Sequence, residues 1–427
     1  MSKLIELDQK YVWHPFTQHQ IERPPLQIVQ GYGSTLVDVN GRKYLDCNSS
    51  WWTILHEHQH PYLKQALIEQ FDELDHVLFA GVTHPKAVEL AYRLAKFTPN
   101  ELTRTFFSDN GSTAIEVAIK MVYQYFHNQN KPKKKILALE GAYHGDTFGA
   151  MSVSSRGNFN KPFEHLFFTV DYLPFPFNTE IEEKNFHLTE KLFESGEFAA
   201  IIVEPIVQGA AGMRMYRPEF LEKWVQIAKK YDVLVVFDEV MTAWGRTGKL
   251  FAMNYINSTP DIVCFSKGVT GGVLPLGITH TSEKIYQGFL SDNKEQALLH
   301  GHSFTANPLA CSLACANFDL IEQADFYDQI DRISKSHHQF YNEIRGHELL
   351  KEVRQTGTII AFELYDAEKN GYFSNIKEKI ITQFIELSCL IRPLGNTFFL
   401  NPPSNTSNEE LQQMYESVRI FLNDWKK

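Results

Sequence analysis

The spacing of apolar and polar residues divides the chain into three stretches. Near the start, short β-like runs at residues 27–30, 35–40 and 43–46 are separated by GYGS and NGR, which are turn-forming sequences. Short runs joined by tight turns predict an antiparallel β-ribbon. From about residue 60 to residue 325, apolar runs alternate with longer helical segments, a pattern typical of a mostly parallel sheet with helices on both faces.

The same pattern locates individual elements. Four apolar runs in the middle stretch are the expected central strands: residues 136–139, 200–203, 233–237 and 262–265. In the tail, β-like runs at 358–364 and 397–400 precede a helix whose start carries Ser407 and Glu410, the residues of a capping box. The apolar residues of that helix fall on one face: Leu411, Met414, Val418 and Phe421.

We therefore predict an α/β fold in two domains. Residues 60–325 would form a large domain around the mostly parallel sheet. Residues 1–59 and 326–427 would together form a smaller α+β domain, because both ends of the chain return to short β-like runs. A ligand cleft is expected between two such domains.

Composition narrows the classes of function. The 427 residues are 43% hydrophobic and carry a formal net charge of −10, which fits a globular protein and leaves no basic field for a nucleic acid. The five cysteines show no CxxC spacing, as expected for buried thiols in a reducing compartment. The first residues lack a signal-peptide pattern, and no apolar run reaches the length of a membrane span. We expect a cytoplasmic protein without nucleic-acid or membrane partners.

Two strands of the middle stretch end in residues that can carry chemistry. In VLVVFDEV an apolar run stops at Asp238, and in DIVCFSKG the next run is followed by Lys267. Ligands of open parallel sheets bind beyond the carboxyl ends of the strands, so both side chains are expected at that edge. Alone, Asp238 could be a helix cap or a salt-bridged acid, and Lys267 a simple anion binder. Together they suit a Schiff-base lysine and a carboxylate for a pyridinium nitrogen.

A third feature completes a candidate cofactor site. In SDNGSTAIEVAIKM, residues Gly111, Ser112 and Thr113 open a segment whose apolar residues have helical spacing. Free N–H groups and hydroxyls at a helix start can bind phosphate, although such a sequence is about as often only a turn with an N-cap. The strand-end acid and lysine favour the phosphate site, because the phosphate, ring nitrogen and aldehyde of one cofactor would each have a partner.

With these residues in place, the chain resembles the class III aminotransferases of fold type I, which use pyridoxal 5'-phosphate, over nearly its whole length. The resemblance is carried by FDEVMTAWGRTGKLFA, PDIVCFSKGVTGGVLPLG, YHGDTFGAMSVS and VEPIVQGAAGM. It implies that Lys267 would hold the cofactor as a Schiff base and transfer the proton, and that Asp238 would keep the ring nitrogen protonated. Tyr143 would stack on the ring, while Gly111 and Ser112 would hold the phosphate.

Other roles follow from the same resemblance. Glu204 and Gln208 would line the site beside the cofactor. Ser303, in the segment HGHSF, would reach the phosphate from the other subunit, which implies a homodimer with shared active sites, and Gly301 of that segment would contact substrate. Arg246 would either shape the site or form an interdomain salt bridge.

Three segments resemble the branch of this class that acts in biotin biosynthesis: VWHPFTQ, SSWWTILHEHQHP and LIRPLGNTFFLNPP. This narrower resemblance implies conversion of 8-amino-7-oxononanoate to 7,8-diaminononanoate, with S-adenosylmethionine as amino donor. Trp51 and Trp52 would wall the alkyl chain of the acceptor. Arg392 would bind its carboxylate in a bidentate fork, and Tyr143 would also contact substrate. Phe16 stands where relatives have a tyrosine and would contact substrate, which leaves lysine open as the donor.

Several alternatives remain beside this interpretation. Another class III enzyme, such as an aminomutase or an ω-aminotransferase of ornithine or 4-aminobutyrate, is disfavoured by the tandem tryptophans and Arg392. A cofactor-binding regulator without catalysis would be expected to lack Lys267. Trp244 stands where the family pattern often has phenylalanine.

Histidines offer a competing metal-site interpretation. Residues 56–60 spell HEHQH, which fits the zinc-protease pattern HExxH. Zinc binding needs both histidines on one helical face, whereas Pro61 biases His60 away from helix. No metal site is predicted. His14, His144 and His302 are expected to be hydrogen-bonded structural histidines.

Overall fold

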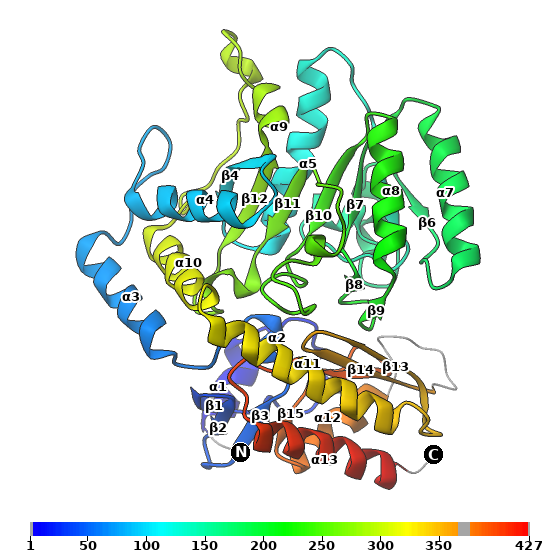
Figure 1. The fold of residues 1–427 in the computed structure, drawn as a ribbon. Coiled ribbons are helices and arrows are strands. Elements are labelled where there is room, and N and C mark those ends of the chain that lie inside the picture. Colours follow the sequence, from blue (N-terminus) through cyan, green and yellow to red (C-terminus); the bar gives the residue numbers. More distant parts are fainter. Residues whose placement is uncertain (1–2, 366–375, 426–427) are drawn as a thin grey trace.

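A seven-stranded sheet forms the centre of the larger part of the molecule (Figure 1). The computed structural model describes residues 3–365 and 376–425. The strands of this sheet are β4 (Leu102–Ser108), β5 (Lys135–Leu139), β6 (Val170–Leu173), β7 (Phe198–Val203), β10 (Leu234–Asp238), β11 (Ile262–Phe265) and β12 (Gly277–Ser282). Their order is β4-β12-β11-β10-β7-β5-β6, and of these strands β12 alone runs antiparallel to its neighbours. The predicted mostly parallel sheet is confirmed.

Helices cover both faces of this sheet, as predicted. The helices of the larger part are α3 (Pro61–Glu73), α4 (Pro85–Phe97), α5 (Gly111–Asn128), α6 (Phe148–Val153), α7 (Thr179–Phe193), α8 (Pro218–Lys230), α9 (Glu283–Gln287) and α10 (Pro308–Ile321). Of these, α3 packs on α10. Successive strand residues point to opposite faces. In β10, Phe237 therefore shares an apolar cluster with Trp224 of α8, whereas Val236 shares another with Val117 of α5. Burial on both faces explains why these strands are continuously apolar in sequence.

Short elements connect the strands of the larger part. They are the hairpin β8 (Val207–Gln208) and β9 (Arg214–Met215), with the 3-10 turns η1 (Lys161–Leu166), η2 (Ala252–Tyr255), η3 (Lys267–Thr270) and η4 (Lys294–Gln296). The turn η3 begins directly at the predicted lysine. It ends at Gly271, whose φ of +66° a glycine adopts without strain.

The smaller part combines both ends of the chain and lies below the sheet in Figure 1. Its strands are β1 (Ile28–Tyr32), β2 (Thr35–Asp38), β3 (Lys43–Asp46), β13 (Leu350–Thr356), β14 (Ile359–Leu364), β15 (Cys389–Leu390) and β16 (Thr397–Leu400). Its helices are α1 (Lys3–Tyr11), α2 (Ser49–Trp52), α11 (Ala324–Ile344), α12 (Ile376–Glu386) and α13 (Asn408–Asp424). The predicted antiparallel ribbon β1-β2-β3 is confirmed.

Pairing between distant segments holds the smaller part together. Strand β15 adds to β3 in parallel and aligns Leu390 with Asp46, a contact that the sequence pattern did not predict. The capping box of Ser407 and Glu410 is present at the start of α13. The domain boundaries at residues 59 and 325 stay a prediction; the second falls inside α11.

Two features bear on the environment of the protein. All five cysteines are buried and free of disulfides. Within residues 3–365 and 376–425, none of the helices combines the length and the apolar character that crossing a lipid bilayer requires.

Candidate active site

A cavity of about 620 Å³ lies at the carboxyl ends of the parallel strands. Seven of the predicted site residues line it: Trp52, Gly111, Ser112, Tyr143, Glu204, Asp238 and Lys267. They come from five segments of the larger part and from α2 of the smaller part. The position agrees with the rule that ligands of open α/β sheets bind beyond the strand ends.

Asp238 ends β10 and is held in place by two hydrogen bonds. Its Oδ2 lies 2.7 Å from His144 Nδ1, and its Oδ1 accepts the backbone N–H of Val240 at 3.0 Å. Both Asp238 and His144 are buried. His144 is hydrogen-bonded, as predicted, but its partner is the candidate cofactor acid, so it takes part in the site. The sequence signal available was its place beside Tyr143.

Lys267 follows β11 with a positive φ of +48°, a conformation rarely adopted by non-glycine residues. Its Nζ lies 5.1 Å from the centre of the Trp52 ring. Burial lowers the pKa of Lys267, while the carboxylates of Asp238 and Glu204 act in the opposite direction. A lowered pKa increases the fraction of neutral amine, which is the form that attacks a carbonyl.

Trp244 packs beneath this lysine turn. It is 1% exposed, and its indole N–H donates to the carbonyl of Ser266 at 3.3 Å. A Cβ on Gly268 would lie 3.0 Å from its ring. The large indole therefore supports the backbone on which Lys267 is mounted.

The start of α5 forms a compact anion cradle. Asn110 caps the helix by accepting the N–H of Thr113 at 2.9 Å, and the Thr113 hydroxyl donates to Asp109 at 2.9 Å. Thr113 thus belongs to the cap, which leaves Gly111 and Ser112 facing the cavity. A Cβ on Gly111 would lie 2.7 Å from Val240, so the helix start fits closely against the end of β10. These features fit a phosphate group.

Glu204 connects two loops of the cavity wall. Its carboxylate accepts the backbone N–H groups of Tyr143 at 3.1 Å and Gly209 at 2.9 Å. Burial raises the pKa of Glu204 to about 7, and the nearby charge of Asp238 adds to this rise, while His144 opposes it. Near neutral pH this side chain can therefore hold or release a proton.

Gln208 does not line the cavity, contrary to expectation. Its Nε2 donates to the carbonyl of Glu140 at 3.3 Å, and its Oε1 accepts from Arg214 at 2.5 Å. It is 1% exposed. In the β8–β9 hairpin Gln208 pairs with Arg214, and its side chain bonds to that residue and to Glu140.

The two adjacent tryptophans face different spaces. Trp52 lines the main cavity, whereas Trp51 and Arg392 line a neighbouring cavity of about 250 Å³. The guanidinium carbon of Arg392 lies 4.4 Å from the centre of the Trp51 ring. The ring of Phe16 lies 5.6 Å from that of Trp51. Together, these groups place aromatic surface and a cation side by side.

A left-handed turn, α2, presents both tryptophans. All four residues have positive φ: Ser49, Ser50, Trp51 and Trp52, at +49°, +45°, +75° and +68°. Each such residue costs roughly 1–2 kcal/mol relative to a right-handed conformation. Contacts from the surrounding segments must offset that strain.

Arg246 is buried and held by hydrogen bonds. It donates to Ser49 Oγ at 3.2 Å, to the carbonyl of Pro402 at 3.1 Å and to that of Ile54 at 2.8 Å. Burial lowers its pKa to about 10. No carboxylate in residues 3–365 and 376–425 lies within 4.0 Å of its guanidinium. Among the described residues, hydrogen bonds to α2 and the tail take the place of the predicted alternative, an interdomain salt bridge.

The remaining predicted residues lie outside the cavity. Gly301 and Ser303 are exposed in the loop before α10 and line neither space. The histidines of HEHQH are not helical, as predicted, since α3 begins only at Pro61. His56 Nε2 lies 2.7 Å from Asn317, and His58 Nε2 lies 2.9 Å from Asp46.

Comparison with known proteins defines the class. The family model of class III aminotransferases matches residues 16–422, so the chain belongs to this family. It is a pyridoxal-phosphate-dependent transaminase. Similarity extends to an amine transaminase from an uncultivated Pseudomonas species, solved in its PLP-bound form, with a TM-score of 0.87 and 27% identity over 96% of this chain and 97% of the other.

Two relatives are more similar in sequence. An adenosylmethionine-8-amino-7-oxononanoate aminotransferase from Synechococcus elongatus is 42% identical over 97% of this chain and 99% of its own. A crystal structure of the enzyme of that name from Methanocaldococcus jannaschii has a TM-score of 0.92 and 34% identity, covering 98% of each chain.

Proposed function

We propose that this enzyme converts 8-amino-7-oxononanoate to 7,8-diaminononanoate in biotin biosynthesis, with S-adenosylmethionine as amino donor. The observation that carries the proposal is the full-length similarity to relatives bearing that name, at 32–42% identity. The aromatic walls and the cation at the cleft support it. Trp51 and Trp52 offer apolar surface to an alkyl chain, and Arg392 offers a fork to its terminal carboxylate.

Each group of the cofactor has a matching residue. Pyridoxal phosphate, when bound, supplies an electron-withdrawing ring that stabilises negative charge beside the reacting nitrogen. Lys267 would hold the aldehyde group of the cofactor. Its amine would then carry the proton between the amine-bearing carbon of the substrate and the former aldehyde carbon of the cofactor. Asp238, oriented by His144, would bind the ring nitrogen and keep it protonated. The N–H groups of Gly111 and Ser112 would bind the phosphate, and Tyr143 would cover the ring face.

Assembly and location belong to the same proposal. Ser303 and Gly301 are exposed and do not line the cavity of their own chain, which fits a role at the site of a second subunit in a homodimer. The buried, unbridged cysteines fit the reducing conditions of the cytoplasm.

The chemistry of the cleft supports S-adenosylmethionine as the donor. S-adenosylmethionine carries an adenine ring and a sulfonium cation, which the aromatic surfaces of Trp51 and Phe16 can receive by stacking and cation–π attraction. Phe16 lacks the hydroxyl that a tyrosine would offer. That loss is worth about 1 kcal/mol, roughly a fivefold to tenfold change in affinity, and too little to change the donor.

A single-turnover experiment tests the donor assignment. Purified enzyme is mixed separately with S-adenosylmethionine, lysine, ornithine and 4-aminobutyrate, without an oxo acid, and loss of the visible absorption band of the bound cofactor is followed. We expect conversion by S-adenosylmethionine. Conversion by lysine alone would overturn the donor, and conversion by ornithine or 4-aminobutyrate alone would favour an ω-aminotransferase of that type.

A further inference from the structure

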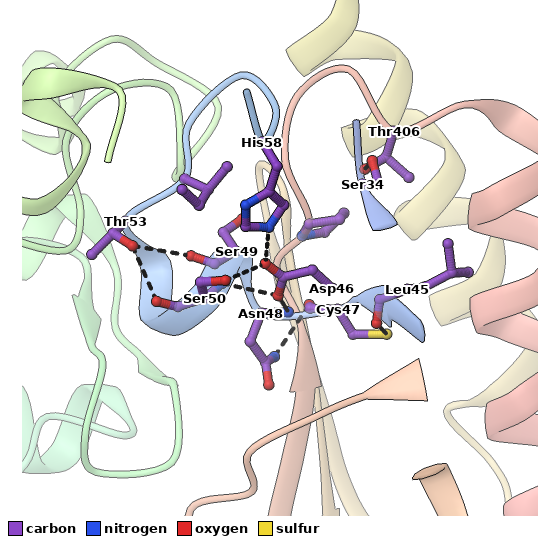
Figure 2. A network of polar contacts seen from close by, with 12 residues as sticks. Ser34, Leu45, Asp46, Cys47, Asn48, Ser49, Ser50, Thr53, His58 and Thr406 are labelled. Carbon is purple, nitrogen blue, oxygen red and sulfur yellow. Dashed lines mark hydrogen bonds and ion pairs between the residues drawn. The ribbon is translucent and has the colours of Figure 1, made fainter. Parts of the chain in front are cut away.

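The left-handed turn α2 is shaped by a buried carboxylate outside the cavities. Asp46 ends β3, and its side chain is 1% exposed. Its Oδ1 accepts the backbone N–H of Ser50 at 2.9 Å, and its Oδ2 accepts the Ser50 hydroxyl at 2.6 Å. Figure 2 shows both bonds converging on the carboxylate. Asp46 therefore binds both the backbone and the side chain of Ser50, the second residue of the turn.

A histidine fixes the carboxylate from the other side. His58 Nε2 lies 2.9 Å from Asp46 Oδ2. A dashed line marks this contact in Figure 2. The backbone of His58 pairs with Gly33, N–H to carbonyl in both directions, at 2.9 and 3.2 Å. The histidine is thereby tied to the β1–β2 hairpin, and Asp46 has little freedom to move away from the turn.

The residues next to the turn are hydrogen-bonded to the segment that carries Arg392. Asn48 Oδ1 accepts the backbone N–H of Arg392 at 2.6 Å, and Asn48 Nδ2 donates to the carbonyl of Phe399 at 2.7 Å. Ser49 Oγ donates to the carbonyl of Asn401 at 2.7 Å. The turn and the arginine thus share one hydrogen-bonded support.

We propose that Asp46 is a positioning residue for substrate binding: by holding Ser50 in the left-handed conformation, it places Trp52 in the wall of the main cavity and Trp51 in the wall of the neighbouring cavity. Asp46 lines neither cavity, so it acts through the turn. Both indoles sit against functional cations, Trp52 against Lys267 Nζ and Trp51 against Arg392. A relaxed turn would move both rings. This inference takes the identity of the acceptor from the proposed function. The positioning of the two tryptophans by Asp46 does not depend on that function.

A matched pair of variants separates positioning from stability. Asp46→Asn keeps the size of the side chain but replaces one acceptor oxygen by an amide nitrogen. Asp38→Asn is the control: Asp38 is a buried carboxylate of the same sheet, 6% exposed, and it accepts the N–H groups of Asn40 and Arg42 at 2.9 Å each. It stabilises the β2–β3 turn, away from the cleft.

Three measurements are made on each holoenzyme: the unfolding midpoint, the near-ultraviolet circular dichroism of tryptophan without substrate, and KM for acceptor and donor. The chain has six tryptophans. The difference between the spectra of the wild type and Trp51→Phe identifies the signal that depends on the Trp51–Trp52 pair. We expect both Asp→Asn variants to unfold earlier. Only Asp46→Asn should change the tryptophan signal and raise the acceptor KM, by roughly tenfold, with cofactor affinity retained.

Glycine provides a rescue because it adopts positive φ without strain. In the Asp46→Asn background, Ser50→Gly should restore the tryptophan signal and lower the acceptor KM, whereas Ser50→Ala should not. If Asp46→Asn does not fold, His58→Gln and Ser50→Ala each remove one partner of the carboxylate and should show the same selective change at smaller size. An unchanged tryptophan signal, or equal changes in Asp38→Asn, would overturn the inference. Wild-type enzyme that fails to use the acceptor would instead overturn the proposed function.

Discussion

Replacing Arg392 by alanine should weaken binding of the acceptor selectively. The guanidinium is half-buried at the edge of the smaller cavity, against the ring of Trp51. A charge-assisted pair with a carboxylate at such a site contributes about 2–3 kcal/mol. Because 1.4 kcal/mol corresponds to a tenfold change, KM for 8-amino-7-oxononanoate should rise roughly 30- to 150-fold. Arg392→Lys keeps the charge but loses the bidentate geometry of the guanidinium, so its KM should lie between those of the wild type and Arg392→Ala.

The assay follows each half-reaction separately by the absorption of the bound cofactor. Arg23→Ala is the control, since Arg23 lines the same cavity but lies 3.9 Å from Glu378 as an ion pair. That variant should change the acceptor KM little, because exposed pairs contribute at most about 1 kcal/mol. Equal damage to the donor half-reaction in Arg392→Ala would refute the reasoning, as would equal effects of the two alanine variants.

Three further predictions follow from single residues. Lys267→Ala should keep non-covalent affinity for pyridoxal phosphate, but its turnover should fall by several orders of magnitude. After borohydride reduction, peptide mapping should find the cofactor attached to Lys267 in the wild type, and no such adduct in the variant. Phe16→Tyr should lower KM for S-adenosylmethionine about fivefold to tenfold, measured in the donor half-reaction, with cofactor affinity unchanged. Burial lowers the pKa of His337 to about 3, below its unfolded value of 6.5, so folding stability should be lost as pH falls through that window. In His337→Gln, the free energy of unfolding measured by urea titration between pH 6.5 and 4.5 should depend less steeply on pH, by up to about 1.4 kcal/mol per pH unit.

Much of the fold could be predicted from the sequence because central strands are buried on both faces, which requires uninterrupted runs of apolar residues. Strands β10 and β11 are uninterrupted apolar runs, and both end at the predicted chemistry, Asp238 and Lys267. Strand β15 escaped prediction because it has two residues and pairs with β3, more than 340 positions away. Pairing at such separation is set by tertiary packing, which local periodicity does not record.

The candidate site divides in the same way. Lys267, Asp238 and the start of α5 could be identified because strand ends and helix starts fix where those side chains lie. Gln208 was misplaced because its side chain bonds to Glu140 and Arg214, which the sequence pattern does not reveal as its partners. His144 and Asp46 carry little signal in sequence, since their roles depend on which carboxylate or hydroxyl packs against them.

Backbone strain concentrates where the cleft needs its large side chains. Phe16, Trp51, Trp52 and Lys267 all have positive φ, and so does Trp244 beneath the lysine. Asp46 holds Ser50 from four positions upstream, but one local carboxylate does not offset the strain of four left-handed residues in succession, so an isolated peptide of this sequence would relax to the right-handed or extended conformation. Further bonds to the turn and to Asn48 before it involve positions 399, 401 and 392, and Arg246 of the larger part. The shape of the pocket therefore depends on the packing of the smaller part against the larger part. Loosening that packing should alter substrate selection before it alters cofactor binding, which α5, β10 and β11 support from within the larger part.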